Sequence, residues 1–363
     1  MRIAFCKFAG LAAGGVEKYL QSLALILKEE GHDIDYYYTN SGPIRGTSWI
    51  HPPNDEACKN LVINSGINII KVDVGYRENN VWYNTNFFEL FDENKYDCLI
   101  TAGNGEPEFP YTHLKNIKII HSVHGDHSFD QPNILKSVLI CGWQAKRWIA
   151  NGGNRDKVEI IPPIVRVPVE YPTDFREKYN IPTEAFVFGM HQRDDPTIYS
   201  PVSLEAFSRL NLEDTYMVIM GGSYLHKNFV SNLQNTSLKE RIIFADFCSG
   251  YVEIHNFLAS IDAYAHSRRD GEVCSASLIE AMYHGKPIIS CPGYNNGHAD
   301  QILGSGFFCS SMEEYINTMR LLKVDKDLYR ERSTKTKESY DRMYSYELVR
   351  KELIRIVDEV GSI

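Results

Sequence analysis

Short apolar runs alternate with longer amphipathic stretches along most of the chain. In the first half, the stretches Val16–Glu30, Asp55–Ser65 and Trp143–Asn151 predict helices; in the first of them apolar residues recur every three or four positions. Apolar runs rich in β-branched and aromatic residues predict strands at Ile3–Phe8, Ile34–Tyr38, Ile67–Val72, Cys98–Thr101, Ile117–Val123, Ser137–Cys141 and Val158–Ile161. Continuous apolar strands separated by helices are typical of parallel sheets that are covered on both faces.

A proline-rich segment interrupts this alternation in the middle of the chain. Between Ile161 and Pro172 four prolines exclude a helix or a central strand, so the segment predicts an interdomain linker. Beyond it, strands are predicted at Phe186–Met190, Met217–Met220, Ile242–Phe244, Ala263–His266 and Pro287–Ser290. Helices are predicted at Pro201–Leu210, Val252–Ser260, Ser277–His284 and Met312–Leu322, followed from Asp325 by a charged helical tail with a break at Met343–Ser345. The pattern therefore predicts two α/β halves, with a ligand in the cleft that the carboxyl ends of their strands face.

Composition and charge narrow the class of protein. The formal charge of −9, from 38 basic and 47 acidic residues, argues against nucleic acid as the main partner. The eight cysteines show no CxxC spacing, so we expect free, mostly buried thiols in a reducing compartment. The first residues lack the apolar run of a signal peptide, and no stretch is long enough for a membrane span. We therefore expect a cytoplasmic protein, for which a peripheral contact with a membrane stays open.

The stretch from Asp270 to Gly285, DGEVCSASLIEAMYHG, carries the strongest chemical signal. Glu272 follows a predicted strand, and Glu280 lies about one turn into the next predicted helix. The small residues Ser275, Ala276 and Ser277 allow a ligand to approach the backbone, where the free N–H groups of a helix start bind diphosphates. Carboxylates beside such an anion accept hydrogen bonds from hydroxyl groups, because they repel the phosphates. The alternative is a surface loop whose acids only stabilise the helix N-terminus.

This stretch resembles the signature of the retaining glycosyltransferases of family 4, which have the GT-B fold. The matching positions are Glu272, Glu280, Ala281, Met282, Gly285 and Pro287. The sequence departs from the signature at Val273, Cys274 and Ser275, where the family usually has Gly, Phe and Gly. The resemblance implies that Glu272 contacts hydroxyls of the donor sugar and that Glu280 contacts the ribose.

Segments of the first half extend the resemblance. Gly14 and Gly15 match the family's acceptor-side glycine loop, although a generic turn between strand and helix is the alternative. In His121–His127, HSVHGDH, the resemblance implies that His124 contacts the donor sugar, with Asp126 and His127 as candidates for the acceptor side. The three histidines of this segment do not all fall on one face, which argues against a metal site there.

Segments of the second half resemble the part of the family's donor site that binds the diphosphate. Phe188–Arg193, FGMHQR, resembles the family's glycine-then-arginine segment, in which an arginine and a later lysine clamp the diphosphate. Gly189 and Arg193 match its first part, but no lysine stands near Thr197 or Ile198. Lys227 is a candidate replacement, with a solvated surface lysine as the simpler alternative. Phe247 falls where the family binds the base, although packing in the core is the commoner role of a single Phe.

The resemblance implies two domains with the GT-B fold: an acceptor-side domain of residues 1–165, completed by a helix over 346–363 that crosses back, and a donor-binding domain of residues 166–345. It also implies retention of anomeric configuration, with the departing phosphate accepting the acceptor's proton. The implied donor is a nucleotide diphosphate sugar, UDP-glucose or GDP-mannose by family frequency. The implied acceptor is a saccharide, a lipid-linked molecule or another hydroxyl compound.

The charges that develop during sugar transfer place a further demand on the site. Negative charge on the leaving phosphate requires cations and N–H donors, which Arg193 and the amides of residues 275–277 can supply. We expect no metal or other cofactor, because Asp33–Asp35 lies in a predicted strand and Asp325–Asp327 in the helical tail. Two other functions stay open: a non-catalytic protein that binds sugar nucleotides, and a nucleotide-sugar epimerase with the GT-B fold.

Overall fold

The structure is a computed structural model that describes residues 1–40, 44–45, 53–246 and 250–363. The chain divides into two compact units. The first comprises Met1–Ile164 and Glu347–Ile363, and the second comprises Val165–Tyr346. The sequence analysis places its boundaries at 165/166 and 345/346, and the roles it gives the two halves remain predictions.

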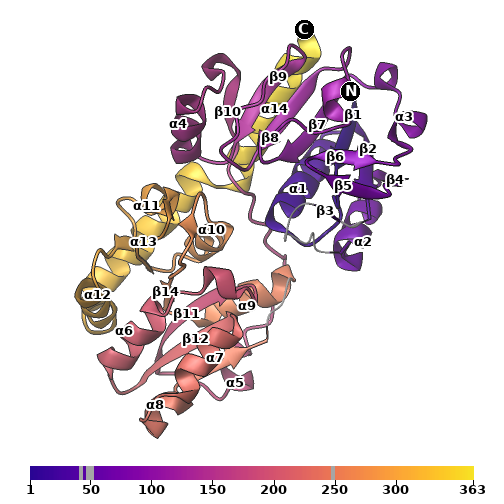
Figure 1. The fold of residues 1–363 in the computed structure, drawn as a ribbon. Helices are drawn as coiled ribbons and strands as arrows, with labels where there is room; N and C mark the ends of the chain where they lie inside the picture. Colours follow the sequence, from indigo (N-terminus) through magenta and orange to yellow (C-terminus); the bar gives the residue numbers. More distant parts are fainter. Residues whose placement is uncertain (41–43, 46–52, 247–249) are drawn as a thin grey trace. The chain divides into compact units, whose positions relative to one another are not determined.

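The first unit is built on a seven-stranded parallel sheet in the order β10-β9-β8-β7-β1-β2-β4 (Figure 1). The central strand β1 is buried at five of its six residues, as expected for a strand covered on both faces. The strands are β1 (Arg2–Lys7), β2 (Asp33–Thr39), β4 (Asn68–Val72), β7 (Cys98–Gly103), β8 (Ile119–Val123), β9 (Ile134–Leu139) and β10 (Val158–Ile160). The main helices of this unit are α1 (Gly15–Glu29), α2 (Glu56–Asn64), α4 (Gly142–Ala150) and α14 (Tyr346–Ser362).

Short elements complete this unit. A small sheet joins β3 (Ile44–Arg45), β5 (Tyr76–Glu78) and β6 (Val81–Tyr83). One further helix is α3 (Phe87–Leu90), and the 3-10 turns are η1 (Glu93–Lys95), η2 (Tyr111–His113) and η3 (Arg155–Lys157). The sequence analysis did not predict them, because two to four residues are too few to show a period.

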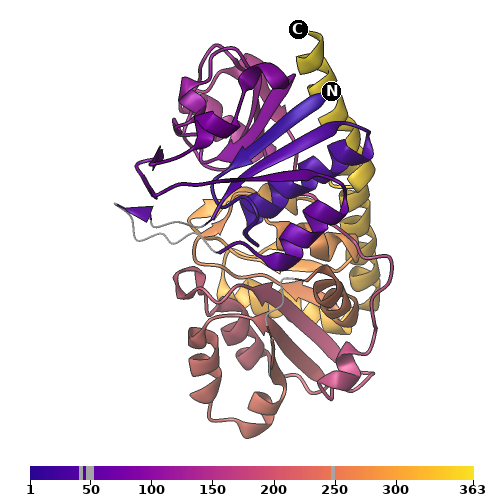
Figure 2. The same cartoon turned by 90° about the vertical axis from the view of Figure 1, so that its right-hand side faces the viewer.

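The last helix, α14, belongs to the first unit although it follows the second in the sequence; it is yellow in Figures 1 and 2. It buries an apolar stripe of Val349, Leu353, Ile356, Val357 and Val360. Ion pairs join it to the body of this unit, among them Arg350 with Glu30 and Lys136 with Glu359. The chain therefore returns to its first unit, as the family resemblance implied.

The second unit contains a six-stranded parallel sheet in the order β13-β12-β11-β14-β16-β18. Its strands are β11 (Phe186–Gln192), β12 (Thr215–Gly221), β13 (Ile242–Ala245), β14 (Ala263–Ala265), β16 (Ile288–Ser290) and β18 (Phe307–Phe308), with a separate pair of β15 (Gly271–Glu272) and β17 (Asn295–Asn296). Its helices are α5 (Phe175–Lys178), α6 (Val202–Leu210), α7 (Tyr224–Ser231), α8 (Thr236–Glu240), α9 (Tyr251–Ser260), α10 (Ala276–Tyr283), α11 (Gly297–Gln301), α12 (Met312–Val324) and α13 (Lys326–Met343), with the turn η4 (Pro196–Ile198).

The strand order of the second unit reverses beside β11. The chain runs from β11 outward to β12 and β13, and then returns to place β14 on the other side of β11. Ligands of doubly wound sheets bind outside the carboxyl ends of the strands at such a reversal. The two units confirm the predicted α/β class with two Rossmann-like halves, and the ends of β11 and β14 mark the place to look for a site.

Most predicted elements appear within one or two residues of their expected bounds, but β9 does not. It was expected at Ser137–Cys141 and spans Ile134–Leu139. Cys141 is instead the N-cap of α4, where its Sγ accepts a hydrogen bond from the backbone N–H of Gln144. An apolar run before a helix start therefore resembles the end of a strand, although its last residue already serves the helix.

The proline-rich segment forms no helix or strand between Ile160, where β10 ends, and Phe175, where α5 begins. Six of the seven cysteines in the described part of the chain are buried and Cys141 is half-buried, whereas Cys248 lies outside it. Among the helices of the described residues, none combines the length and the hydropathy that a membrane span requires.

Candidate active site

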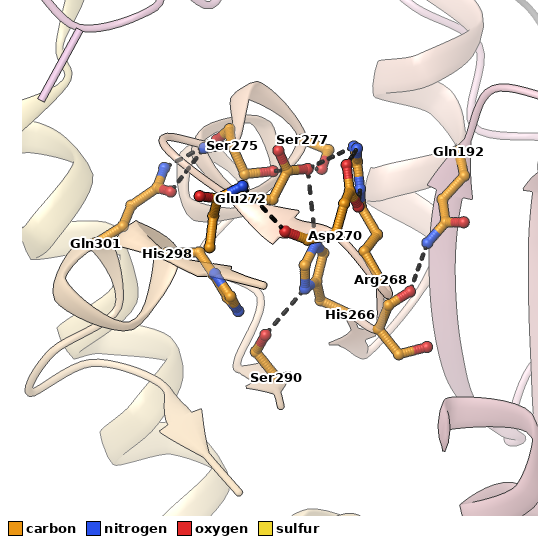
Figure 3. Close-up of polar contacts among 12 residues, drawn as sticks. Gln192, His266, Arg268, Asp270, Glu272, Ser275, Ser277, Ser290, His298 and Gln301 are labelled. Atoms are coloured by element: carbon orange, nitrogen blue, oxygen red, sulfur yellow. Dashed lines mark hydrogen bonds and ion pairs between the residues drawn. The ribbon is translucent and has the colours of Figure 1, made fainter. Parts of the chain in front are cut away.

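The carboxyl ends of β11 and β14 are joined by a side chain. Gln192, the last residue of β11, donates from Nε2 to the carbonyl oxygen of Ser267 at 2.8 Å (Figure 3). Ser267 follows β14 and is fully buried. This hydrogen bond fixes the two strand ends relative to each other. Residues 268–275 then lead to the start of α10.

The start of α10 has free backbone donors. Ser275 is the N-cap, and its own N–H donates to Oε1 of Gln301 at 2.9 Å, while Nε2 of Gln301 donates to the carbonyl oxygen of Ser275 at 2.8 Å. Within the described residues the amides of Ala276 and Ser277 have no hydrogen-bond acceptor. Of the three predicted diphosphate amides, that of Ser275 is therefore occupied, and those of Ala276 and Ser277 are available to an anion.

Glu272 lies directly before this helix start and is surrounded by donors. Its Oε1 accepts from Nη1 of Arg268 at 2.7 Å and from Oγ of Ser275 at 3.2 Å, and it lies 3.8 Å from Nε2 of His266 (Figure 3). Burial by itself raises the pKa of this carboxyl, but His266 and Arg268 outweigh that effect and hold the pKa below its usual value. Glu272 is therefore an anion at neutral pH, and its side chain is 15% exposed.

Arg268 is held in place from its other edge. Its Nε and Nη2 donate to the two oxygens of Asp270 at 2.9 and 2.6 Å, a bidentate arrangement. Gly271 then turns the chain with φ of +64°, and a Cβ there would lie 1.8 Å from the carbonyl oxygen of Asn295. Only glycine fits this approach of β15 to β17, which sets the position of Glu272.

His266 is a further residue that faces the carboxylate of Glu272. Its Nδ1 lies 2.9 Å from Oγ of Ser290, and the hydroxyl of Tyr315 donates to its carbonyl oxygen at 3.1 Å. Burial lowers the pKa of His266, so the ring is neutral at neutral pH. The arrangement in which Ser290 donates to Nδ1 puts the ring hydrogen on Nε2, which faces Glu272.

Glu280 has a different partner. It lies in the middle of α10, its side chain is 15% exposed, and its Oε2 is 2.8 Å from Nε2 of His191 on β11. The hydroxyl of Tyr264 lies 3.2 Å from both the backbone N and Nδ1 of His191, which holds the ring. The two glutamates thus lie before and within α10, and their partners come from two different strand ends.

The remaining predicted donor residues occupy varied positions. Arg193 is 53% exposed and pairs with Asp195 at 2.8 Å, and Asp195 also accepts from the backbone N–H of Thr197. Gly189 is buried in β11, where a Cβ would lie 2.6 Å from Cγ2 of Ile261, so packing explains this glycine. Lys227 is exposed on α7. Phe247 lies outside the described residues.

In the first unit, the glycine loop encloses a buried ion pair. Lys7 at the end of β1 lies 3.1 Å from Glu17 in the first turn of α1, and both side chains are less than 10% exposed. Gly14 is the N-cap of α1, and a Cβ there would lie 2.1 Å from Oε2 of Glu17. Gly15 is exposed, with open space around its Cα. Glycine at 14 is therefore required by the carboxylate beneath it, whereas at 15 no neighbour requires it.

The segment after β8 directs its side chains to different neighbours. Nε2 of His124 lies 3.0 Å from Oγ of Ser122, and its ring packs edge-on against Tyr19. Asp126 pairs with Arg147 at 2.8 Å, and His127 lies 3.1 Å from Glu106. Burial and the nearby Lys7 lower the pKa of His124 to about 3, so its imidazole is neutral. In the described part of the chain, no group of three or more His, Cys, Asp or Glu side chains is placed to hold a metal ion.

The sequence analysis missed five residues that organise the site: His191, Gln192, His266, Arg268 and Gln301. Arg268 was detectable, because it stands four positions before Glu272 in the strongest motif. The others were not, since His191 and Glu280 are 89 residues apart in the sequence and Gln301 follows Ser275 by 26. No local pattern identifies such partners.

Residues 173–339 match a protein-family model described as "Glycosyl transferases group 1". The match covers most of the second unit, including both glutamates and the start of α10. No curated protein matches the sequence.

Solved structures resemble the chain over its whole length. The Anabaena protein Alr3699/HepE, solved in complex with UDP and glucose, is 16% identical with a TM-score of 0.70, and the match covers 100% of both chains. A glycosyltransferase from Rickettsia africae is 17% identical with a TM-score of 0.75, covering 99% of this chain and 98% of its own. Sucrose-phosphate synthase from Thermosynechococcus elongatus is 14% identical with a TM-score of 0.69, covering 100% and 99%. At these identities the likeness shows the fold, which is GT-B.

Proposed function

We propose that this protein, a glycosyltransferase by its group 1 domain and its GT-B fold, transfers a hexosyl unit from a nucleotide diphosphate sugar to a hydroxyl acceptor. One observation carries the proposal: two carboxylates, Glu272 and Glu280, precede and follow in the chain the free amides of Ala276 and Ser277 at the start of α10. A diphosphate fits the amides, and hydroxyl groups on both of its sides fit the carboxylates.

We take the roles of the donor side from the family resemblance. Glu272 accepts hydroxyls of the donor sugar, and Glu280 accepts those of the ribose, with His191 as its present hydrogen-bond partner. Arg193 adds a cation for the leaving phosphate after exchange of its pairing with Asp195. The complex of the Anabaena neighbour with UDP and glucose supports UDP-glucose as the first donor to test, and GDP-mannose is the second.

The acceptor side is assigned to the first unit. His124 contributes a neutral imidazole that contacts the donor sugar, and the loop of Gly14 and Gly15 with Asp126 and His127 receives the acceptor. The acceptor is a saccharide, a lipid-linked molecule or another hydroxyl compound. We propose that the reaction retains the anomeric configuration of the donor sugar and needs no metal. The leaving phosphate accepts the proton of the acceptor hydroxyl.

The test is a panel assay on the whole chain. Each sugar nucleotide is incubated with and without a mixture of candidate acceptors, and free nucleotide diphosphate, free sugar and transfer product are quantified. We expect one donor to be cleaved slowly with water alone and faster with the right acceptor, and NMR of the product to show the anomer of the donor. An inverted product contradicts retention. Binding without any turnover contradicts the proposed transfer.

An epimerase is the enzymatic alternative, and the same assay separates it. Epimerisation converts the sugar of the added nucleotide or releases a changed sugar without dependence on an acceptor. The group 1 match over 173–339 favours transfer.

A further inference from the structure

We propose that Arg268 is a positioning residue of the transfer reaction: held by Asp270, it fixes one oxygen of Glu272 so that the other oxygen is offered to the donor sugar. The inference rests on the proposed function, because it assigns Glu272 to the sugar. It adds a residue that acts on the donor only through that glutamate.

Carboxylates already use three of the five N–H donors of the Arg268 guanidinium. Nε and Nη2 are used by Asp270, and Nη1 is used by Oε1 of Glu272. The side chain is only 18% exposed. Two of its N–H donors remain, but two carboxylates already orient and neutralise the guanidinium, so Arg268 is poorly suited to be the cation that holds the diphosphate. Its neighbour Arg269 is exposed, and its guanidinium contacts the hydroxyl of Tyr294.

The donors around Glu272 converge on a single oxygen. Arg268 and Ser275 both donate to Oε1, and Nε2 of His266 faces that same atom. Within the described residues Oε2 of Glu272 has no hydrogen-bond donor. A carboxylate held through one oxygen keeps the lone pairs of the other oriented and unsatisfied, which is what a sugar hydroxyl requires.

The charge of the cluster points to the same ligand class. Asp270 and Glu272 carry two negative charges, Arg268 carries one positive charge, and His266 is neutral. The cluster therefore keeps one net negative charge beside the helix start. It repels phosphate and favours the neutral hydroxyls of a sugar, which leaves the diphosphate to the amides of Ala276 and Ser277.

The first experiment measures positioning without activity. The carboxyl of Glu272 is titrated by NMR in the wild type and in Arg268→Gln, with Arg269→Gln as the matched control. We expect the pKa of Glu272 to rise in Arg268→Gln, because a cation bonded to its oxygen is lost, and to stay unchanged in Arg269→Gln. An unchanged pKa in Arg268→Gln overturns the inference. If that variant does not fold, Arg268→Lys keeps the charge but not the bidentate pairing with Asp270, and a smaller rise in the pKa of Glu272 is expected.

The second experiment is a double-mutant cycle on sugar-nucleotide hydrolysis with Arg268→Gln, Glu272→Gln and the double variant. We expect Arg268→Gln to lower kcat about tenfold or more with little change in the KM for the donor, and to add little in the Glu272→Gln background. We also expect the acid limb of its pH–rate profile to move to higher pH. Additive effects, or a raised KM with unchanged kcat, mean that Arg268 acts on the ligand directly and overturn the inference.

The two experiments separate this inference from the proposed function. If the wild type neither binds nor cleaves any nucleotide sugar, the proposed function is wrong. The positioning of Glu272 by Arg268 is still decided by the carboxyl titration, and its part in sugar transfer is then rejected together with the function.

Discussion

The loop after β14 and the loop after β11 each carry an arginine, but they hold it differently. After β14, Arg268 is 18% exposed and makes three hydrogen bonds to two carboxylates. After β11, Arg193 is 53% exposed, and among the described residues its one ion-pair partner is Asp195, two positions along the chain. The charged groups of the loop after β14 are thus held by one another without a ligand. The cation of the loop after β11 is exposed to solvent.

Under the proposed function, this difference suits the two loops to different steps. A carboxylate that must recognise a sugar during bond breaking gains from fixed geometry, because no reorganisation is then needed as charge develops. A cation that must grip a diphosphate and later release it gains from an exchangeable local partner. An exposed arginine–carboxylate pair is worth about 1 kcal/mol or less, so a phosphate can displace it.

The largest effect is expected from Glu272→Ala, which removes from the loop after β14 the carboxylate that is proposed to contact the donor sugar. Turnover should fall about 100-fold or more with a smaller change in donor KM, because contacts to the reacting sugar strengthen in the transition state. Steady-state hydrolysis and transfer kinetics measure both parameters. Wild-type kcat in this variant would remove Glu272 from the reacting centre.

Arg193→Ala tests the loop after β11. We expect kcat/KM to fall about 100-fold, the scale for loss of one preorganised donor to a developing charge, and Arg193→Lys to recover part of it. The control is Asp195→Asn, which frees the arginine without removing it and should leave kcat/KM within about threefold, since the exposed pair is weak. Near-normal kinetics in Arg193→Ala would leave this arginine as a surface partner of Asp195. A lysine introduced at the exposed Thr197 should raise turnover if a second cation is missing.

Glu280→Ala should act on binding more than on turnover. A contact to the ribose exists in both the ground and the transition state, so we expect donor KM to rise about tenfold with kcat nearly unchanged. His191→Ala should give a smaller rise, because it removes the partner of Glu280 and not the contact itself. Calorimetric titration with the nucleotide diphosphate checks both. A larger fall in kcat than in affinity would move Glu280 to the reacting sugar.

The lowered pKa of Glu272, in the loop after β14, should also change how the free energy of unfolding depends on pH. The folded pKa of Glu272 is lowered, so its ionised form stabilises the fold above the unfolded pKa of about 4.3 and this contribution disappears as pH falls through the folded pKa. The stability difference between wild type and Glu272→Gln should therefore shrink on acidification, by on the order of 1 kcal/mol. Denaturant unfolding at pH 7 and at pH 3.5 measures it. A difference that grows on acidification contradicts the lowered pKa.

The smallest effect is expected from a chelator. If the amides of α10 and the arginines neutralise the diphosphate, EDTA should change the transfer rate by less than about twofold, because neither loop brings together the oxygen ligands that Mg²⁺ requires. A complete loss that Mg²⁺ or Mn²⁺ restores would contradict metal independence and reopen the histidines after β8.

The apolar periods of the sequence determined the α/β class and most strand and helix positions in both halves, although not α5, α7 or α8, because these periods depend on local spacing. Its prolines determined the segment without helix or strand between the two halves. The apolar periods did not reveal β15, β17 or α11, which are short and exist through contacts with neighbours distant in sequence. Glu272 and Glu280 were detectable for the same local reason, since they lie only eight positions apart in one chain segment.

Tertiary structure alone decided what surrounds those glutamates. Burial of His266 beneath Glu272, the pairing of His191 with Glu280, and the use of the Ser275 amide by Gln301 each join residues from different strands or loops. Sequence spacing does not encode which strand ends meet at the reversal beside β11. The charges were visible in the sequence, but only the fold determines which carboxylate is fixed by Arg268 and which is left with a histidine, because that depends on distance and burial.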